Sequence, residues 1–368
     1  MTQPSYPRTI WTFTLLIIGA GLITLYSASY DNVRVSHQVF YDQLYCAGAG
    51  IAIMYFLGRM NYRHFFEGAY VFYGINLFFL LAVLLVGRSA LGATRWFNIF
   101  GFSFQPSELS KIAVILMLGR YFSTRNPKLS FNFRSSFYAL CRDLVYPFFL
   151  MLLSFVLIFK QPDLGSGILV FGIFVVMLYA SGIDRKPFLI FVGTCLAFVP
   201  VGWHLLKDYQ KDRLLVFMNP NIDPLGAGYT IIQSKIAIGS GQLWGKGWLA
   251  GTQNQLNFLP ERHTDFIFSV IGEEWGFLGA MALLVCYFVL IYTAIEIAGK
   301  LKDKFGYLVV AGIVSILALQ VVINMSMTMG LSPVVGITLP LISYGRTSFL
   351  VFMIMMGFLL NISQKRSL

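Results

Sequence analysis

Long hydrophobic runs separated by short polar segments dominate the sequence. A helix of about 20 apolar residues is long enough to cross a bilayer. The pattern therefore predicts an all-α integral membrane protein, a polytopic bundle of about ten transmembrane helices in a single domain over 1–368. The expected spans are 9–29, 39–58, 68–87, 106–123, 144–159, 165–182, 187–206, 266–298, 306–329 and 343–361. Because 266–298 is longer than one crossing needs, we expect that helix to be tilted or broken.

Two stretches between the runs do not have the pattern of spans. Residues 90–111 alternate aromatic and polar side chains and place Arg95 beside Trp96. This alternation indicates either an aromatic belt or an interfacial or re-entrant piece on the outer face. The outer segment of about 207–264 is rich in Gly and Pro, and its run Tyr229–Ile238 predicts a short amphipathic helix. Loops of this length are usually functional or disordered, and its many apolar and aromatic residues favour function.

The charge balance indicates how the chain is oriented. Only 12% of residues are charged, against about 25% in soluble domains, and the net charge is +11. Fifteen Lys and Arg lie on the side of the N-terminus and five in the short loops opposite, so both termini are expected to be cytoplasmic. The positive charge then faces anionic lipid, and no nucleic acid partner is expected. No disulfide framework is expected either, because no cysteine falls in an outer loop.

Two groups of ionisable residues fall in or beside the early spans. Glu108 and Lys111 are three residues apart and share a helix face. They form either a structural ion pair or a pair presented to a polar ligand, because charge at membrane depth often marks function. Asp163, in the turn "KQPDLGSG" of 160–167, is either the cap of the next helix or a substrate-binding group.

The segment "NFLPERHTDFIFSVIGEEWG" (257–276) concentrates charge at the mouth of the eighth span. Thr264 or Asp265 could cap that helix. Alternatively, Asp265, beside Glu261, Arg262 and His263, lies at the outer boundary where the head of a lipid-linked substrate would rest. Lipid and aromatic neighbours there would raise the pKa of its carboxyl toward that of a general base, whereas Arg262 and the helix dipole would lower it.

The two glutamates that follow belong to a different environment. Glu273 and Glu274 lie about 12 to 14 Å further along the helix at 1.5 Å per residue, too far to form a pair with Asp265. We expect them to be buried against lysine or backbone partners.

Metal and nucleotide signals are weak. His263 and Asp265 offer two ligands, but the other histidines have no metal-site spacing. A transient Mg²⁺ or Mn²⁺, held by a carboxylate against a pyrophosphate, is more plausible than a permanent site. No resident cofactor is firmly implied, and no Gly-rich phosphate loop of the Walker or Rossmann type is present.

Several motifs of the chain resemble those of a known family. "FLPERHTDFIFSVIGEEWG" (258–276) is similar to the signature of the SEDS family (shape, elongation, division and sporulation), and its Arg is typical of the rod-shape-determining branch. The resemblance extends along nearly the whole chain. Its other motifs are "GATRW" (92–96), "FQPSELSK" (104–111), "QPDLGSG" (161–167), "GYTIIQSKIAIGSG" (228–241), "GKGWLAGTQ" (245–253) and "SYG" (343–345).

The resemblance implies a peptidoglycan glycosyltransferase that polymerises lipid II at the outer face of the bacterial cytoplasmic (inner) membrane during cell elongation. The implied partners are a class B penicillin-binding protein, which crosslinks the strands, and other membrane proteins of the elongation complex.

The resemblance also implies roles for individual residues. Asp265 matches the family's essential carboxylate and would act as general base. Arg95 and Lys111 match cavity positions that would offset pyrophosphate charge, with Glu108 holding Lys111. Glu261, Arg262 and His263 would orient the loop or the sugars.

One position departs from the family. Arg346 follows Gly345 where the family usually has a second glycine. Its guanidinium could snorkel to the interface, add an anion contact or impair a close helix approach.

Two other functions stay open: a lipid II flippase or transporter, and a non-catalytic scaffold for cell-wall synthases.

Overall fold

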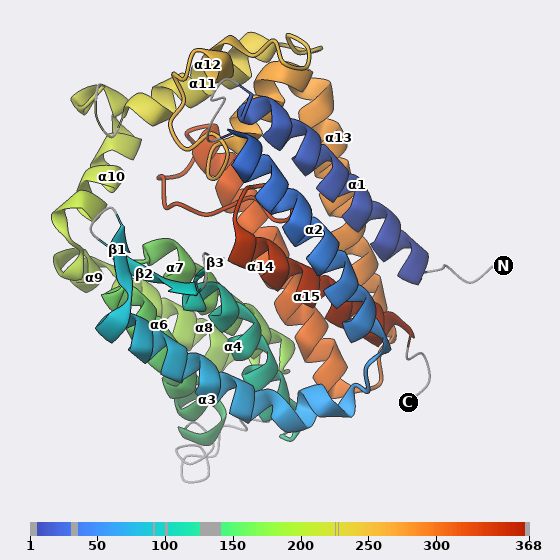
Figure 1. Cartoon of the computed structure of the whole chain (residues 1–368). Helices are drawn as coiled ribbons and strands as arrows, with labels where there is room; N and C mark the ends of the chain where they lie inside the picture. Colours follow the sequence, from blue (N-terminus) through green and yellow to red (C-terminus); the bar gives the residue numbers. More distant parts are fainter. Residues whose placement is uncertain are drawn as a thin grey trace. The chain divides into compact units, whose positions relative to one another are not determined.

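The computed structural model describes residues 6–30, 36–90, 93–99, 102–125, 141–224, 226 and 228–364. Of the basic residues counted for topology, Arg34, Lys128, Arg134, Lys365 and Arg366 lie outside these ranges. The described chain is mainly helical (Figure 1). Its elements are α1 (Tyr6–Ala28), α2 (Ser36–Arg59), α3 (Arg63–Val86), β1 (Arg88–Ala90), β2 (Ala93–Ile99), β3 (Phe102–Phe104), α4 (Pro106–Ser123), η1 (Cys141–Val145), α6 (Tyr146–Lys160), α7 (Leu164–Ala180), α8 (Arg185–Ala197), α9 (Val199–Leu205), α10 (Asp208–Met218), η2 (Pro220–Ile222), α11 (Tyr229–Gly241), α12 (Thr252–Gln255), α13 (Ile267–Lys300), α14 (Lys304–Thr328) and α15 (Arg346–Gln364).

The predicted polytopic helical membrane fold is confirmed. Among the described residues, seven helical segments are long and apolar enough to cross a membrane. They are Tyr6–Ala28, Arg63–Val86, Arg142–Lys160, Arg185–His204, Ile267–Lys300, Lys304–Thr328 and Arg346–Gln364. The other three predicted spans are also helical: α7 is shorter, and α2 and α4 are less apolar.

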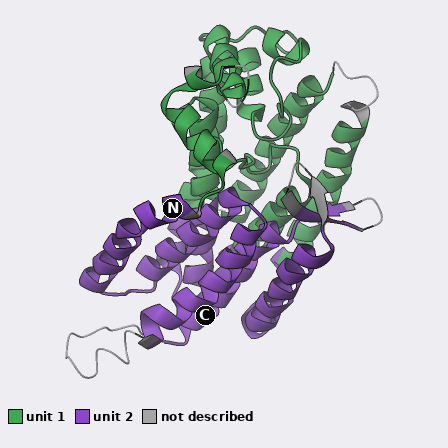
Figure 2. Cartoon of the chain, turned by 90° about the vertical axis from the view of Figure 1, so that its left-hand side faces the viewer, with its two compact units in different colours: residues 1–57, 206–293, 317–360 green, residues 58–205, 294–316, 361–368 purple. Residues whose placement is uncertain are grey.

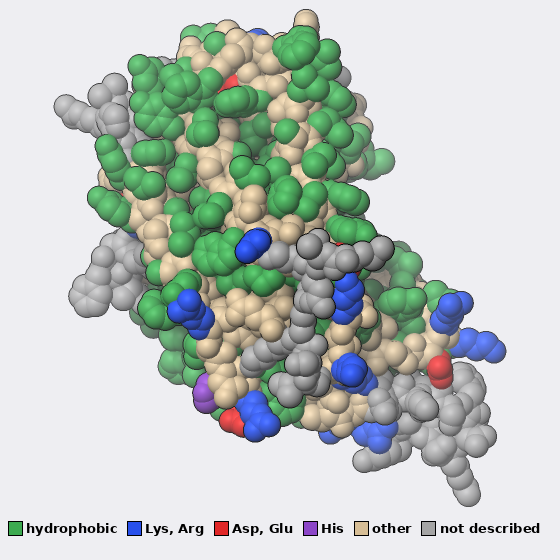
Figure 3. Space-filling model, turned by 90° about the vertical axis from the view of Figure 1, so that its right-hand side faces the viewer, with side chains coloured by type: hydrophobic (Ala, Val, Ile, Leu, Met, Phe, Trp, Pro, Cys, Tyr) green, Lys and Arg blue, Asp and Glu red, His purple; other side chains and the backbone are tan. Residues whose placement is uncertain are grey.

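The surface of the helices is unusually apolar. Hydrophobic side chains cover much of the face drawn in Figure 3. Large side chains such as Leu85, Val86, Phe56 and Phe78 are more than half exposed. A monomeric soluble protein rarely exposes contiguous apolar patches of this extent, so these side chains are placed to face lipid.

The chain divides into two compact units, coloured separately in Figure 2. Unit 1 holds Met1–Leu57, Leu206–Thr293 and Leu317–Leu360, and unit 2 holds Gly58–Leu205, Ala294–Ile316 and Asn361–Leu368. Each unit is therefore assembled from segments that are distant in the sequence.

Helix α4 lies at the centre of unit 2. It packs against α3, α6 and α7, and 15 of its 18 residues are buried. A helix covered on all sides can be less apolar than a lipid-facing one, because its polar groups meet protein partners instead of acyl chains.

The stretch before α4, predicted as an aromatic belt or an interfacial or re-entrant piece, contains a small antiparallel sheet of order β1-β2-β3. Strand β2 pairs with β3 in the register Phe97–Phe104, Asn98–Ser103 and Ile99–Phe102. The alternation of aromatic and polar residues is thus the period of two of a β-strand. The rings of Phe97 and Phe104 lie 6.5 and 5.8 Å from that of Phe79 on α3, and so join the sheet to the helix.

Helix α13 is broken in its part within unit 1, which is one of the two outcomes, tilted or broken, that the length of its hydrophobic run predicted. Gly276 has φ 63° and ψ −161°, which interrupts the helical ladder. The segment before α12 satisfies the backbone groups at the break. Phe277 N–H donates to the Gln242 carbonyl (2.9 Å) and Leu278 N–H to that of Leu243 (3.2 Å). In return, Lys246 N–H and Gly247 N–H donate to the carbonyls of Glu273 (2.9 Å) and Glu274 (3.0 Å).

Candidate functional site

The loop of residues 261–266, directly before α13, carries the candidate base. It turns back on itself: the Glu261 carbonyl accepts from the N–H groups of Thr264 (3.1 Å) and Phe266 (3.3 Å), and Glu261 has φ 51°. Asp265 follows in this turn, half-buried and two residues before the helix begins. The loop therefore carries a half-buried aspartate on a compact backbone.

Three consecutive carbonyls of this loop are held by partners from a distant part of the chain. The Tyr344 N–H donates to the His263 carbonyl (2.8 Å). The Ser343 hydroxyl donates to the Thr264 carbonyl (2.6 Å), and the Asn324 side-chain amide to the Asp265 carbonyl (2.9 Å). The backbone on either side of the carboxylate is thus fixed.

The Asp265 carboxylate itself lies against Gly336. A Cβ atom added to this glycine would be 3.4 Å from Oδ2 of Asp265, and Gly336 has φ +70°. Only a residue without a side chain adopts this conformation at no steric cost. The bare backbone at 336 therefore leaves room beside one carboxylate oxygen.

Arg262 anchors the loop. Its guanidinium is buried and donates to the carbonyls of Ala28 (2.7 Å) and Asn254 (2.6 Å) and to the Asn257 side chain. These contacts support the predicted role of orienting the loop.

The His263 ring packs near that of Tyr344, with 5.9 Å between centroids. Burial lowers the pKa of His263 below its ordinary 6.5. The negative charge of Glu261 raises this pKa, and the positive charge of Arg262 lowers it. The imidazole is therefore neutral at neutral pH. Glu261 is exposed, and its carboxylate accepts from the Thr264 hydroxyl (3.2 Å).

Glu273 and Glu274 are buried with lysine, side-chain and backbone partners, as predicted. Glu273 accepts from the Lys246 ammonium (2.7 Å), the Thr252 hydroxyl (3.1 Å) and the Gln253 N–H (3.0 Å). Glu274 accepts from the Ser27 hydroxyl and from the amide of Asn254 (3.4 Å). Glu273 thus joins α13 to the segment that crosses its break, and Glu274 joins α13 to α1 and α12. These contacts stabilise the scaffold of the site.

In unit 2, the predicted Glu108–Lys111 pair is formed. The ammonium lies 2.7 Å from Oε1 of Glu108, and Lys111 is fully buried. Among the residues that the structure describes, none donates a hydrogen bond to the second, buried carboxylate oxygen of Glu108. A buried carboxylate oxygen without a donor is costly, so this oxygen is an acceptor available to a polar ligand or water.

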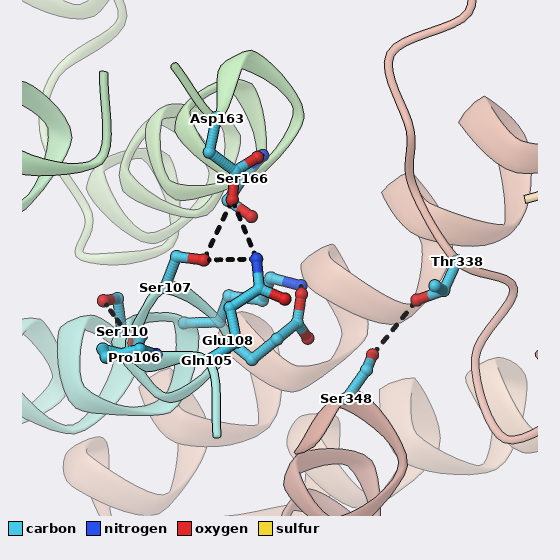
Figure 4. A network of polar contacts seen from close by, with 10 residues as sticks. Gln105, Pro106, Ser107, Glu108, Ser110, Asp163, Ser166, Thr338 and Ser348 are labelled. Atoms are coloured by element: carbon cyan, nitrogen blue, oxygen red, sulfur yellow. Dashed lines mark hydrogen bonds and ion pairs between the residues drawn. The ribbon is translucent and has the colours of Figure 1, made fainter. Parts of the chain in front are cut away.

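Asp163 caps α7, one of its two predicted roles, and also joins α7 to α4. Its carboxylate accepts from the Ser166 N–H (3.2 Å), the Gln105 amide (3.1 Å) and the Ser107 hydroxyl (2.9 Å), drawn in Figure 4. With three donors and 4% exposure, it organises the turn that precedes α7. Its predicted contact with substrate stays a prediction.

Arg95 on β2 binds the same turn. Its Nε donates to the Gln161 carbonyl (3.1 Å) and its Nη2 to that of Pro162. The structure therefore brings Arg95 and Asp163 to adjacent positions. The two motifs that contain them gave no indication of this proximity.

Several functional neighbours were missed by the sequence reasoning. Asn324, Ser343, Gln105 and Ser107 all hold a candidate residue or its loop. Asn324 gave a signal, because a buried amide within the apolar run of α14 requires polar partners. Gln105, Ser107 and Ser343 stand in the motifs "FQPSELSK" (104–111) and "SYG" (343–345), but the motifs alone assigned them no role.

Comparison with known proteins gives the same picture along the whole chain. The FtsW/RodA/SpoVE family model, described as a cell cycle protein, matches residues 7–368. The chain is 38% identical over 389 residues to the peptidoglycan glycosyltransferase MrdB of Escherichia coli (strain K12), covering 100% of this chain and 99% of that relative. It is 36% identical over 357 residues to the stage V sporulation protein E of Bacillus subtilis (strain 168), covering 95% of each.

Solved structures are similar in fold. One, titled as the structural coordination of polymerization and crosslinking by a peptidoglycan synthase complex, matches with a TM-score of 0.81 and 30% identity over 99% of both chains. The crystal structure of the Thermus thermophilus rod shape determining protein RodA matches with a TM-score of 0.71 and 27% identity, over 100% of this chain and 99% of that one.

Proposed function

Because the chain belongs to the FtsW/RodA/SpoVE family, we propose that it is a peptidoglycan glycosyltransferase that polymerises lipid II into glycan strands during cell elongation. The observation that carries this proposal is the placement of Asp265. It is a half-buried carboxylate at the end of a membrane helix, on a loop whose three successive carbonyls are fixed. A general base needs this combination of access and fixed geometry.

In the proposed reaction, Asp265 removes the proton from the acceptor sugar hydroxyl. That oxygen forms a bond to the anomeric carbon of the donor, while the bond from this carbon to the lipid pyrophosphate breaks. The proton passes to Asp265, the electron pair leaves with the pyrophosphate, and inversion at the anomeric carbon is expected.

The groups of unit 2 are proposed to serve substrate binding. Arg95 and Lys111 would offset pyrophosphate charge, and Glu108 holds Lys111 in place. Asp163 would stabilise the turn to which Arg95 binds, because its carboxylate caps the helix that follows. In unit 1, Glu261, Arg262 and His263 would orient the loop or the sugars. Most of these side chains are buried, so a substrate must reach them for the proposed roles to hold. Variants at each position are therefore tested for the affinity for lipid II as well as for the rate of polymerisation.

The proposed setting is the bacterial cytoplasmic membrane, with both termini inside and Asp265 at the outer face. The proposed partners are a class B penicillin-binding protein and other membrane proteins of the elongation complex. The similarity to a synthase complex that coordinates polymerization and crosslinking supports the first of these.

A divalent ion would enter with the substrate. Within the described part of the chain, no group of three or more His, Cys, Asp or Glu side chains could hold a metal. Mg²⁺ is commonly bound by one or two carboxylates together with substrate phosphates. Asp265 would be such a ligand, and the assay therefore includes Mg²⁺, Mn²⁺ and chelator arms.

The test is polymerisation of lipid II by the purified full-length chain in detergent, with and without its penicillin-binding partner. We expect wild type to make polymer and Asp265→Ala and Asp265→Asn to make none, since an amide cannot accept the proton. Asp208→Asn, at a fully exposed side chain of the outer segment, is the matched control and should match wild type.

Other outcomes would identify another function. Headgroup translocation in vesicles without any polymer would indicate the flippase or transporter, for which a buried Glu108–Lys111 pair is also suited. Polymer made at the wild-type rate by Asp265→Asn would indicate a scaffold whose associated synthase does the chemistry.

A further inference from the structure

We propose that Asn324 and Ser343 are positioning residues that set the orientation of the Asp265 carboxylate. This inference rests on the proposed function, because it assigns these residues a purpose in the same reaction. Their hydrogen bonds to the loop are with backbone carbonyls, so each acts through the backbone of the loop that carries the carboxylate.

Asn324, on α14, is fully buried and uses its amide nitrogen twice. It donates to the Asp265 carbonyl (2.9 Å) and to the Ile337 carbonyl (2.7 Å). One side chain therefore connects the backbone of Asp265 to the segment that contains Gly336. Gly336 is the residue against which the Asp265 carboxylate lies. A shift of either segment alone would break one of the two hydrogen bonds.

Ser343 makes the second connection between the same two segments. Its hydroxyl donates to the Thr264 carbonyl (2.6 Å) and accepts from the Leu339 N–H (2.7 Å). With both the donor and an acceptor position in use, the hydroxyl cannot rotate without loss. The Tyr344 N–H then holds the His263 carbonyl (2.8 Å) as the third contact in sequence.

Together these contacts resist rotation about the backbone next to Asp265. Without them, the loop keeps its internal turn through the Glu261 carbonyl, but its position relative to residues 336–344 is no longer fixed. A displacement of about 1 Å of a catalytic group can lower the rate about a hundredfold. Substrate affinity, which depends on other contacts, would change much less.

The experiment compares kcat and KM for lipid II polymerisation among Asn324→Ala, Asn324→Leu and Ser343→Ala. Asn324→Leu keeps about the size of the side chain and removes its donors without adding a charge, so it separates hydrogen bonding from packing. Asn361→Ala and Ser315→Ala are matched controls, because these buried groups donate to the carbonyls of Met60 (2.8 Å) and Gly312 (2.7 Å), away from the loop.

We expect kcat to fall at least about tenfold in all three positioning variants, with KM within about threefold of wild type. The controls should keep kcat within about twofold. Melting temperature and gel filtration are measured on each protein. If the Asn324 variants do not fold, Ser343→Ala, which removes a single oxygen, carries the comparison alone.

The inference is overturned if kcat of the positioning variants falls no further than that of the controls, or if the loss is entirely in KM. If that happens while Asp265→Asn is inactive, only the positioning role is wrong. If Asp265→Asn polymerises lipid II like wild type, the general-base proposal itself is wrong.

Discussion

Arg346 Nη1 lies 3.7 Å from Asp42 Oδ2, joining the first residue of α15 to α2. The Tyr344 hydroxyl is 3.5 Å from the same carboxylate oxygen. The basic residue that departs from the family's usual glycine therefore has an acidic partner within the same unit. Both side chains are about one-quarter exposed, so the pair is partly screened by solvent.

This pairing predicts coupling between the two positions. Arg346→Gln and Asp42→Asn should each lower the stability of the detergent-solubilised protein, by up to about 1 kcal/mol. The double variant should lose less than the sum, because each single change leaves one charge unpaired. Thermal unfolding of the four proteins measures the coupling, and strictly additive losses would show that the two side chains do not interact.

The Lys246–Glu273 pair predicts a larger effect. Lys246→Met leaves the fully buried Glu273 carboxylate without its cation and should destabilise the protein by about 3 kcal/mol or more. Adding Glu273→Gln should recover much of the loss. Lys300→Met breaks an exposed pair of the same 2.7 Å length and should change stability by less than about 1 kcal/mol. Equal losses in the buried and exposed pairs would contradict this account.

The break in α13 predicts that Gly276 is intolerant of a side chain. It has positive φ, and a Cβ atom would lie 2.3 Å from the Gly245 nitrogen. Gly276→Ala should therefore destabilise the protein by about 2 kcal/mol or more. Gly299→Ala, on the same helix with open space around its Cβ position, should be neutral or slightly stabilising. Unfolding temperatures test the contrast, and a Gly276→Ala protein as stable as wild type would refute it.

The buried His263 predicts a loss of stability on acidification. Its pKa is lowered in the folded protein by burial, so below about pH 6.5 the unfolded chain binds a proton that the folded chain does not. The penalty is absent above that pH and grows as the pH falls. His263→Gln should flatten the decline of melting temperature between about pH 7 and pH 5. An unchanged slope in His263→Gln would refute the prediction.

Hydrophobic run length was sufficient to predict where the long apolar helices lie, because a bilayer imposes one length on every crossing. It did not predict α10 and α12, which are not apolar runs. The excess length of 266–298 indicated a tilted or broken helix, and the structure has the break, at Gly276. The small sheet was missed, because the alternation of 90–111 also fits an interfacial loop and the strands that pair with the seven-residue β2 have only three residues each. Their pairing depends on α3, through Phe79, which no local pattern can show.

The candidate site was predictable as far as each motif is local. The spacing of Glu108 and Lys111 gave their ion pair, and the turn before α7 gave the Asp163 cap. The partners of Asp265 and Arg262 were not predictable, because they are supplied by residues up to 234 positions away, such as Ala28 for Arg262. Long-range contacts of this kind depend on how helices pack, and the hydrophobic periodicity of a single sequence does not indicate which residues meet.

The burial of α4 has a consequence for how the protein is made. This helix is less apolar than the seven segments suited to crossing a membrane unaided, and it carries a glutamate and a lysine. Charged side chains oppose the release of a segment from the translocon into lipid, most strongly near its centre, and Lys111 is the sixth of the 18 residues of α4. Biogenesis of the chain would then require α4 to wait at the translocon until neighbouring helices shield it, so nascent chains truncated soon after residue 123 should integrate poorly.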